Sequence, residues 1–307
     1  MNDLGLALDS YLAVRRALGF KLERNEHMLR RFVEYAQEQQ SSIVTTELAL
    51  AWATQSNTAT PFTHAKNLGA VRGFTRYLQA SDPRHEVPPV ELIPYRKIRY
   101  QPYIYSDEDI TALLEAAQRI RHPLMADTYT TLFGMLAVTG MRLGEALALD
   151  RDDFDDNEAV LIIRDSKFNK SRQLPLHSTT RDALHAYANK RNELISRPQA
   201  PSFLISTSGT RLISQNVHAI FWRLRQRVGL NERLPNKPRI HDLRHSFAVK
   251  TIRRWYEAGL DVEQKLAYLS TYLGHVNPTS TYWYLTATPD LMALAAKRLE
   301  RAMGELP

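Results

Sequence analysis

Prolines crowd one segment of the chain, and this segment limits what the rest can fold into. They occupy positions Pro83, Pro88, Pro89, Pro94 and Pro102 of the 307-residue sequence. Proline fixes φ and lacks an amide hydrogen, so neither a helix interior nor a central strand passes through such a segment. The segment therefore predicts a linker over residues 83–103, which separates a domain of residues 1–82 from a domain of residues 104–307.

Helical periodicity fills the part of the chain before the linker. Apolar residues recur with helical spacing over residues 4–18 and again over residues 28–36. A third helix is expected to be capped by Thr46 and to end at residue 53, and a fourth to be capped by Thr63 and to end at residue 78. Four helices without strands predict a compact helical bundle.

The part after the linker is expected to be mostly helical, with one small antiparallel sheet. Ser106 and Asp109 form a capping box that opens a helix through residue 119. A helix over residues 124–138 stops at Thr139-Gly140 and resumes over residues 142–149. Short apolar stretches over residues 159–164 and 172–176 predict a β-hairpin. Further helices are expected over residues 179–196, 214–228, 241–259, 262–273, 280–285 and 289–303. The fold class predicted is mainly α (α+β).

Composition excludes several kinds of site. Cysteine is absent, which removes disulfides, thiolate metal sites and iron–sulfur clusters. Lys and Arg number 40 against 33 Asp and Glu, and the net charge of +7 is a weak indication of a polyanionic partner. The first ten residues lack the pattern of a secretory signal, and the apolar stretch 132–149 contains two charges, which favours a buried helix over a membrane span. A cytoplasmic protein without membrane association is expected.

Arg142 and Glu145 interrupt the most apolar stretch of the chain, within TGMRLGEALAL. A buried arginine either pairs with a nearby carboxylate or is held for an external anion. Taken alone, this segment favours the structural pair.

Three basic residues lie at the expected hairpin tip, SKFNKSRQLPL, at Lys167, Lys170 and Arg172. Such residues could contact phosphate, and a lysine with a lowered pKa could donate a proton. A solvated basic turn is the more common explanation.

His241, Arg244 and His245 share one face of the helix that contains HDLRHSFA. A zinc site is disfavoured because Asp242 replaces the glutamate of the zinc-protease motif and no further ligand lies close in sequence. An arginine fork beside a histidine donor is typical of a clamp for an oxyanion. The alternative is a helix with a capping histidine and a surface arginine.

The string TYLGH ends at His275 and is followed by Tyr282 and Tyr284. Tyrosine has an ordinary pKa of about 10, so it is a weak nucleophile unless a base or cations stabilise its phenolate. Aromatic clusters more often belong to a core than to a reactive site.

In chain order, these segments resemble the tyrosine recombinase/integrase family, of the phage integrase and Xer type. The resemblance rests on Arg142, Lys167, His241-x-x-Arg244, His275 and a tyrosine nine residues later, with the flanking strings TGMRLGEALAL, SKFNKSRQLPL, HDLRHSFA and TYLGH. It covers the whole chain. It implies an N-terminal helical core-binding (SAM-like) bundle, a linker, and a mostly helical recombinase catalytic domain with a small antiparallel β-sheet.

The resemblance implies two arginines that bind the scissile phosphate and one nucleophile. Arg142 and Arg244 are expected to contact its nonbridging oxygens and to stabilise the pentacoordinate transition state more than the ground state. Glu145 is expected to orient or pair with Arg142. Tyr284 is expected to attack phosphorus and form a 3′-phosphotyrosyl intermediate.

The same resemblance implies how protons move. Lys167 is expected to protonate the departing 5′ oxygen, while His241 and His275 hydrogen-bond the phosphate and assist proton transfer. No metal and no other cofactor is expected, because guanidinium and imidazole groups supply the charge that divalent ions supply in many nucleases.

Two of these assignments keep an alternative. Lys170 is an alternative to Lys167, because Phe168 follows Lys167 where the family often has glycine. Tyr282 is an alternative to Tyr284, although the family interval from the last histidine favours Tyr284.

Further contacts with the DNA backbone are expected from basic residues of the linker, the hairpin and the later helices. They are Arg96, Lys97, Arg99, Lys170, Arg172, Arg211, Arg223, Arg225, Arg227 and Arg239. For the linker residues, a merely solvated segment is an equally common explanation.

The function implied is site-specific recombination of double-stranded DNA at specific sites, in transposition or integration of a mobile element at the bacterial nucleoid. A homo-oligomer is expected, a dimer on one site and a tetramer in the synapse, with related recombinases as further partners. The C-terminal helix 289–303 either packs on its own domain or docks into a neighbouring protomer. A relaxing topoisomerase of type IB and a DNA-binding accessory protein without catalysis remain as alternatives.

Overall fold

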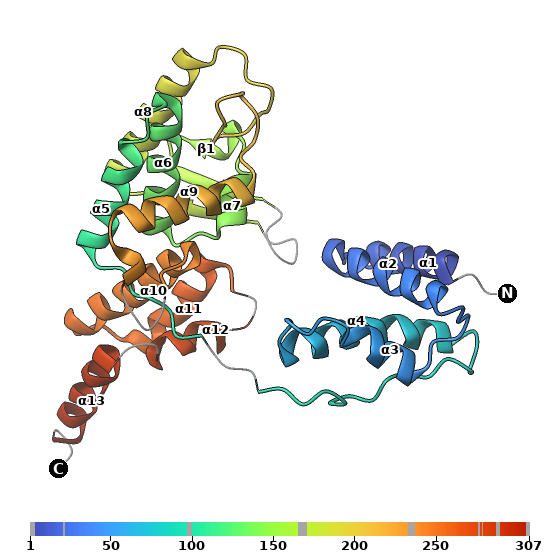
Figure 1. Cartoon of the computed structure of the whole chain (residues 1–307). Coiled ribbons are helices and arrows are strands. Elements are labelled where there is room, and N and C mark those ends of the chain that lie inside the picture. Colours follow the sequence, from blue (N-terminus) through green and yellow to red (C-terminus); the bar gives the residue numbers. More distant parts are fainter. Residues whose placement is uncertain are drawn as a thin grey trace. The chain divides into compact units, whose positions relative to one another are not determined.

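The computed structural model describes residues 4–20, 22–96, 100–164, 171–232, 237–275, 277, 279–286 and 289–304. The chain forms two compact units, Met1–Arg99 and Tyr100–Pro307 (Figure 1). The boundary falls inside the proline-rich segment. Each unit has its own core of buried apolar side chains.

The N-terminal unit is the predicted bundle of helices. These are α1 (Leu4–Ala17), α2 (Glu23–Glu38), α3 (Thr46–Ala53) and α4 (Pro61–Gln79). Both predicted caps were wrong. The N-cap of α3 is Thr45, whose side chain accepts from Leu48 N, and the N-cap of α4 is Thr60, which precedes Pro61. An N-cap needs extended backbone just before the first helical residue, and proline favours the first helical position that follows it.

The chain after α4 is fixed against this bundle. Arg72 Nε donates to Pro88 O at 2.7 Å, and Nη2 donates to Pro89 O at 2.6 Å. His85 is buried, and its Nδ1 accepts a hydrogen bond from Val44 N at 2.9 Å. The first part of the proline-rich segment therefore belongs to the surface of the N-terminal unit.

The larger unit is mostly helical, as predicted. Its helices are α5 (Asp107–Gln118), α6 (Pro123–Thr139), α7 (Leu143–Ala148), α8 (Ser178–Leu194), α9 (Ser214–Arg227), α10 (Ile240–Glu257), α11 (Val262–Leu273), α12 (Thr279–Tyr282) and α13 (Pro289–Gly304). The Ser106–Asp109 capping box is present. The helix predicted over residues 280–285 is shorter, because a 3₁₀ turn, Trp283–Thr286, follows Tyr282.

A small antiparallel sheet of order β1-β2-β3 accompanies these helices. The predicted hairpin consists of β2 (Val160–Ile163) and β3 (Arg172–Pro175), paired from Val160 with Pro175 to Ile163 with Arg172. Strand β1 (Phe154–Asp155) was not predicted, since two residues carry no alternating pattern.

Two apolar clusters form the core of the larger unit, and α10 contributes to both. Ile240 and Leu243 belong to the cluster that includes the sheet, while Ala248 and Val249 belong to the cluster that includes α11 and Tyr284. The first turns of α10 therefore lie where the two clusters meet.

The apolar residues of α13 divide into two groups. Leu291 is buried and Leu294 packs against the same core cluster, so the helix begins by packing on its own unit. The side chains of Met292, Leu299 and Met303 are exposed. Among the described helices, none has both the length and the apolarity needed to cross a membrane.

Candidate active site

The turn between α6 and α7 is built around Gly140. This residue ends α6 with a left-handed φ of 62°, and a Cβ placed on it would lie 2.5 Å from Phe247 Cδ1. Glycine is required because both the dihedral angle and the space exclude a side chain. The turn places Arg142 at the N-cap of α7.

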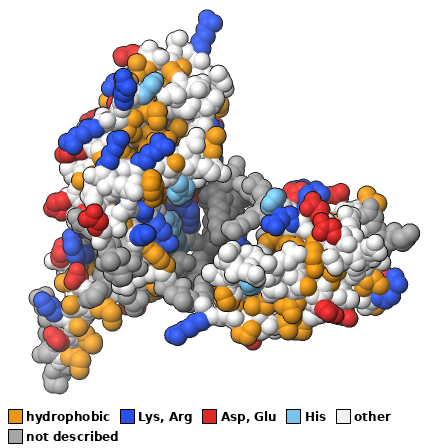
Figure 2. Space-filling view, viewed as in Figure 1, with side chains coloured by type: hydrophobic (Ala, Val, Ile, Leu, Met, Phe, Trp, Pro, Cys, Tyr) orange, Lys and Arg blue, Asp and Glu red, His pale blue; other side chains and the backbone are white. Residues whose placement is uncertain are grey.

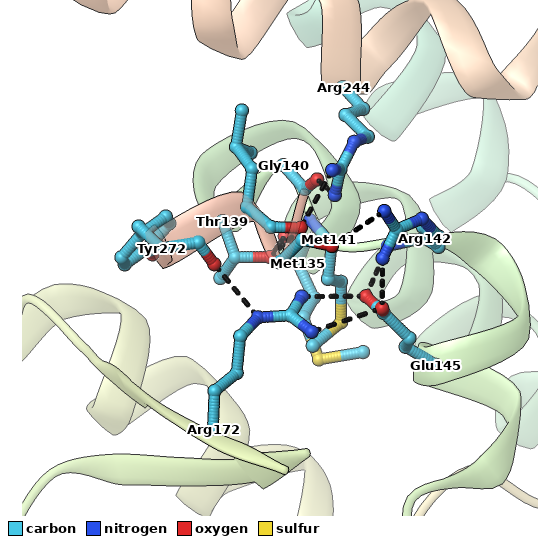
Figure 3. A network of polar contacts seen from close by, with 11 residues as sticks. Met135, Thr139, Gly140, Met141, Arg142, Glu145, Arg172, Arg244 and Tyr272 are labelled. Atoms are coloured by element: carbon cyan, nitrogen blue, oxygen red, sulfur yellow. Dashed lines mark hydrogen bonds and ion pairs between the residues drawn. The ribbon is translucent and has the colours of Figure 1, made fainter. Parts of the chain in front are cut away.

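A second glycine ends α11. Gly274 has a φ of 66°, and its carbonyl oxygen accepts a hydrogen bond from Arg142 Nη2 at 3.0 Å. Arg244, which is 2% exposed, donates from Nη1 to Gly140 O at 2.8 Å and from Nη2 to Leu273 O at 2.7 Å (Figure 3). The C-terminal ends of α6 and α11 thus converge on the two arginines.

Glu145 lies between Arg142 and Arg172. Its Oε1 accepts from Arg142 Nη1 at 2.7 Å, and its Oε2 accepts from the backbone N of Arg142 at 2.8 Å. Arg172 donates from Nη1 and Nη2 to the same two oxygens, at 3.1 and 2.8 Å (Figure 3). Burial raises the pKa of Glu145, but these bonds and the two positive charges outweigh it and lower the pKa to about 2. Glu145 is therefore an anion that both arginines share.

Aromatic and imidazole rings surround Tyr284. The ring of His275 is nearly parallel to it, with centroids 6.1 Å apart, and the ring of His245 meets it edge-on at 5.5 Å. His241 in turn meets His245 at 4.7 Å. His275 Nδ1 is hydrogen-bonded to Thr281 Oγ1 at 2.7 Å. Rings from α10, from His275 just after α11 and from the turn after α12 thus form one cluster.

Burial and the arginines shift the pKa values in this cluster. Burial raises the pKa of Tyr284, whereas the charge of Arg244 opposes the rise. Desolvation, with the charges of Arg244 and Arg142, lowers the pKa of His275 to about 4. Desolvation and the neighbouring arginines also lower the pKa of His241, although part of that side chain is exposed. Both histidines are therefore neutral near pH 7.

Figure 3 shows three guanidinium groups, of Arg142, Arg172 and Arg244, and one carboxylate, of Glu145. Arg142 and Arg172 pair with this carboxylate, whereas Arg244 donates to Gly140 O. The cationic charge exceeds the anionic charge in this network, which suits an anion with two free oxygens. Within the described residues, no group of three or more His, Asp or Glu side chains is arranged to hold a metal ion.

The structure brings most of the predicted site residues together. The site contains Arg142, Glu145, His241, Arg244, His275 and Tyr284. Tyr284 is 2% exposed, whereas the alternative nucleophile Tyr282 is 47% exposed. The predicted residues Lys97, Arg99, Lys167 and Lys170 lie outside the described residues.

Two arginines that were predicted to contact DNA are held by the protein. Arg211 donates to Leu147 O at 2.8 Å and pairs with Asp150, and Arg225 donates to Pro238 O. Arg172 lies inside the site, as described above. In the structure, these three side chains make contacts within the protein.

The remaining arginines predicted to contact DNA are more open. Arg96, Arg223 and Arg227 are exposed. Arg239 is also exposed, but it pairs with the buried Asp242 and lies 3.3 Å from the ring centroid of Tyr100. Figure 2 shows Lys and Arg side chains interspersed with Asp and Glu on the visible face of the larger unit, rather than one basic band.

Sequence reasoning missed two groups in this site. Thr281, which holds His275, precedes Tyr284 by three residues but belongs to no motif. The carbonyl groups of Gly140 and Gly274 are backbone atoms, and the only signal for them was glycine at each helix end.

Comparisons with known proteins agree with this arrangement. Residues 104–290 match the Phage integrase family. The chain is 44% identical to a putative integrase/recombinase, y4rB, of Sinorhizobium fredii, over 98% of both chains. It is 30% identical to the tyrosine recombinase XerC of Azotobacter vinelandii, over 72% of this chain and 68% of the relative. In structure it is similar to the Tn1549 transposon integrase in complex with transposon right end DNA, with a TM-score of 0.68, 16% identity, and coverage of 96% of this chain and 98% of the other.

Proposed function

Since the chain belongs to the phage integrase family and is a tyrosine site-specific recombinase, we propose that it cuts and rejoins DNA strands through Tyr284. The Tyr284 oxygen attacks the scissile phosphorus and loses its proton, while the bond to the 5′ oxygen breaks and that oxygen gains a proton. The products are a 3′-phosphotyrosyl link and a free 5′ hydroxyl. A 5′ hydroxyl of another strand then attacks the link and releases Tyr284, so the number of phosphoester bonds is conserved.

The place of Tyr284 beside His275 and Arg244 carries this proposal. Tyr284 and Arg244 are both buried, the ring of Tyr284 lies against the ring of His275, and the charge of Arg244 opposes the rise in the pKa of the Tyr284 hydroxyl. A phosphate that meets Tyr284 would therefore also meet a cation. Charge that develops on the phosphate in the transition state is stabilised by such a fixed donor more than charge in the ground state.

Arg142 and the two histidines complete the phosphate site in this proposal. Arg142 is held at its backbone N and at both terminal nitrogens, so its guanidinium has a fixed direction. His241 and His275 are neutral near pH 7, so each can donate one hydrogen bond and accept another. We assign them to the phosphate oxygens and to transfer of the Tyr284 proton.

The role of the general acid rests on the sequence alone. Lys167 is proposed as the acid that protonates the 5′ oxygen, with Lys170 as the alternative. Both lysines lie outside the described residues.

Arg96, Arg223 and Arg227 are proposed to contact the DNA backbone, where positive charge gives salt-dependent affinity.

The stoichiometry of strand exchange supports a tetramer. Two duplexes contain four strands, and each protomer supplies one Tyr284, so complete exchange needs four protomers, two on each site. The exposed side chains of Met292, Leu299 and Met303 on α13 suit a contact with a neighbouring protomer. Related recombinases could take some of these four places.

A role in a mobile element is supported by the relatives. One is a putative integrase/recombinase, and a structural neighbour is the integrase of a transposon bound to transposon end DNA. We infer that this chain acts on the ends of mobile DNA at the nucleoid, within the cytoplasm.

A nicked suicide duplex tests the nucleophile. The duplex is taken from repeats that flank the gene and carries a nick close to the cut site, so that the released strand diffuses away and a covalent adduct accumulates. We expect an adduct that forms in the presence of chelator, is absent with Tyr284→Phe and persists with the matched variant Tyr282→Phe. An adduct that survives Tyr284→Phe and disappears with Tyr282→Phe would transfer the role to Tyr282.

The same substrate separates the alternatives. Relaxation of supercoiled plasmid without a specific site would favour a topoisomerase. Tight binding to the flanking repeats with no adduct on any nicked duplex would favour an accessory DNA-binding protein.

A further inference from the structure

Arg172 joins three segments that are distant in sequence. It begins β3, its two terminal nitrogens bind Glu145 of α7, and its Nε donates to Tyr272 O near the end of α11 at 2.8 Å. All three nitrogens of its guanidinium are therefore bound within the protein. Its side chain is 10% exposed, which leaves little surface for DNA.

The two oxygens of Glu145 are fully used by the two arginines. Oε1 accepts from the Nη1 atoms of both Arg142 and Arg172, and Oε2 accepts from Arg142 N and Arg172 Nη2. A carboxylate offers about four acceptor positions, so none is left over. The two terminal nitrogens of Arg172 therefore orient the carboxylate of Glu145, and this carboxylate in turn orients Arg142.

The charges of Arg142, Glu145 and Arg172 also link Arg172 to Arg142. Glu145 alone would neutralise Arg142 and weaken its attraction for a phosphate. Arg172 supplies the charge that balances Glu145, so the triad keeps one net positive charge. The positive charge of Arg142 then remains available to an anion.

Arg172 also occupies the space beside Gly274. A Cβ on Gly274 would lie 2.7 Å from Arg172 Nη1 and 3.0 Å from its Cζ. The carbonyl of the same glycine binds Arg142, and His275 is the next residue. The end of α11 is therefore held between Arg142 and Arg172.

From this geometry we propose that Arg172 is a positioning residue for the reaction. It balances and orients Glu145 so that Arg142 can bind the scissile phosphate, and it fixes the end of α11 that carries His275. The inference rests on the function proposed above, because it concerns the same phosphate site.

Single-turnover adduct formation on the nicked duplex from the flanking repeats tests it, at saturating DNA. We expect Arg172→Met to slow adduct formation by about 10²-fold, the loss typical when a stabilising donor is removed. The Kd for the same duplex, measured in a Tyr284→Phe background, should change by less than about threefold. Arg172→Lys should retain an intermediate rate, because it keeps the charge and loses the fork.

The double variant Arg172→Met with Glu145→Gln distinguishes this role from mere support of the fold. Removing the carboxylate also removes the charge that Arg172 balances, so we expect the double variant to form adduct about tenfold faster than Arg172→Met alone. Arg191→Met is the matched control, since Arg191 is also buried but donates to Phe203 O outside the site. It should lower Tm without changing the rate of the folded enzyme.

Other outcomes overturn the proposal. Arg172 is a phosphate contact if Arg172→Met weakens DNA binding about tenfold and reduces the slope of log K against log salt by about one, while the rate of adduct formation at saturating DNA is unchanged. If the double variant forms adduct more slowly than Arg172→Met alone and than Glu145→Gln alone, Arg172 does not act through Glu145. Failure of the wild-type chain to form any adduct would reject the proposed function itself, whereas a wild-type adduct with an unchanged Arg172→Met rate would reject only this inference. Should Arg172→Met fail to fold, the rates of Arg172→Lys with and without Glu145→Gln decide the question.

Discussion

Thr281 Oγ1 lies 2.7 Å from His275 Nδ1, and this contact fixes the imidazole ring that faces Tyr284. Thr281 is 1% exposed, so water cannot replace its hydroxyl group easily. The bond holds one ring nitrogen, which leaves Nε2 of His275 for the phosphate or for a proton.

Thr281→Val should therefore slow adduct formation by about tenfold, a fraction of what general acid–base groups supply. It should lower the free energy of unfolding by about 1 kcal/mol, because a buried hydrogen bond is lost. Thr281→Ser should restore the rate. Thr271→Val is the control, as Thr271 makes an exposed bond to Ala267 O on α11. Equal rates for Thr281→Val and the wild type would show that the ring needs no such anchor.

Gly274→Ala should damage the site more than a matched glycine substitution. Gly259 has nearly the same φ, 67°, but nothing lies within 4 Å of its would-be Cβ. Gly259→Ala should cost about 1 kcal/mol for the left-handed backbone and leave adduct formation unchanged. Gly274→Ala adds a clash with Arg172, so we expect a loss of about 2–3 kcal/mol and at least a tenfold slower rate. Urea denaturation and the adduct assay measure the two effects, and similar results for both variants would contradict the clash.

Stability should fall as pH falls from about 6.5 to about 4. Desolvation and nearby arginines lower the pKa of His275 to about 4, and desolvation and neighbouring cationic groups lower the pKa of His245 to about 3. The unfolded chain therefore binds these protons first as the pH falls, which favours unfolding. Each histidine contributes a slope of at most about 1.4 kcal/mol per pH unit in this window.

Urea denaturation at several pH values between 7 and 4.5 checks this expectation. His275→Asn should flatten the dependence, whereas substitution of the exposed His218 should leave it as in the wild type. A slope that is unchanged in His275→Asn would argue that the ring is not desolvated in solution.

Arginines of α9 should separate into two classes in DNA binding. Arg223 and Arg227 are exposed, while Arg225 donates to Pro238 O. Arg223→Ala and Arg227→Ala should each reduce the slope of log K against log salt by about one, at unchanged Tm. Arg225→Ala should lower Tm and keep the slope. Titrations of a fluorescent duplex over a range of salt concentrations distinguish these outcomes, and the reverse pattern would contradict the assignment.

Local features of the fold were predictable because they depend on neighbouring residues. Helix α11 begins and ends at the predicted residues, and β2 and β3 pair within the two short stretches that predicted a hairpin. The caps were predicted at Thr46 and Thr63 instead of Thr45 and Thr60, because more than one threonine lies near the start of each helix and only the backbone geometry selects among them.

The candidate site was predictable as a set of residues but not as an arrangement. The spacing of His241 and Arg244 placed them on one face of a helix. No local pattern shows that Arg244 binds the carbonyl of Gly140, 104 residues away, or that Arg172 binds Tyr272 O, 100 residues away. Such contacts arise only when α6, α10 and α11 pack together.

The carbonyl groups that end α6 and α11 have a consequence for how DNA binding is driven. They lie at the negative ends of two helix dipoles, so they attract guanidinium groups without adding a formal charge. A free arginine side chain carries about 2 kcal/mol of rotamer entropy. Arg142 and Arg244 lose this freedom when the chain folds, so binding of a phosphate need not immobilise them again. The entropic cost of immobilising these two side chains is therefore part of folding and not of DNA binding. More of their electrostatic attraction to phosphate remains to stabilise the transition state.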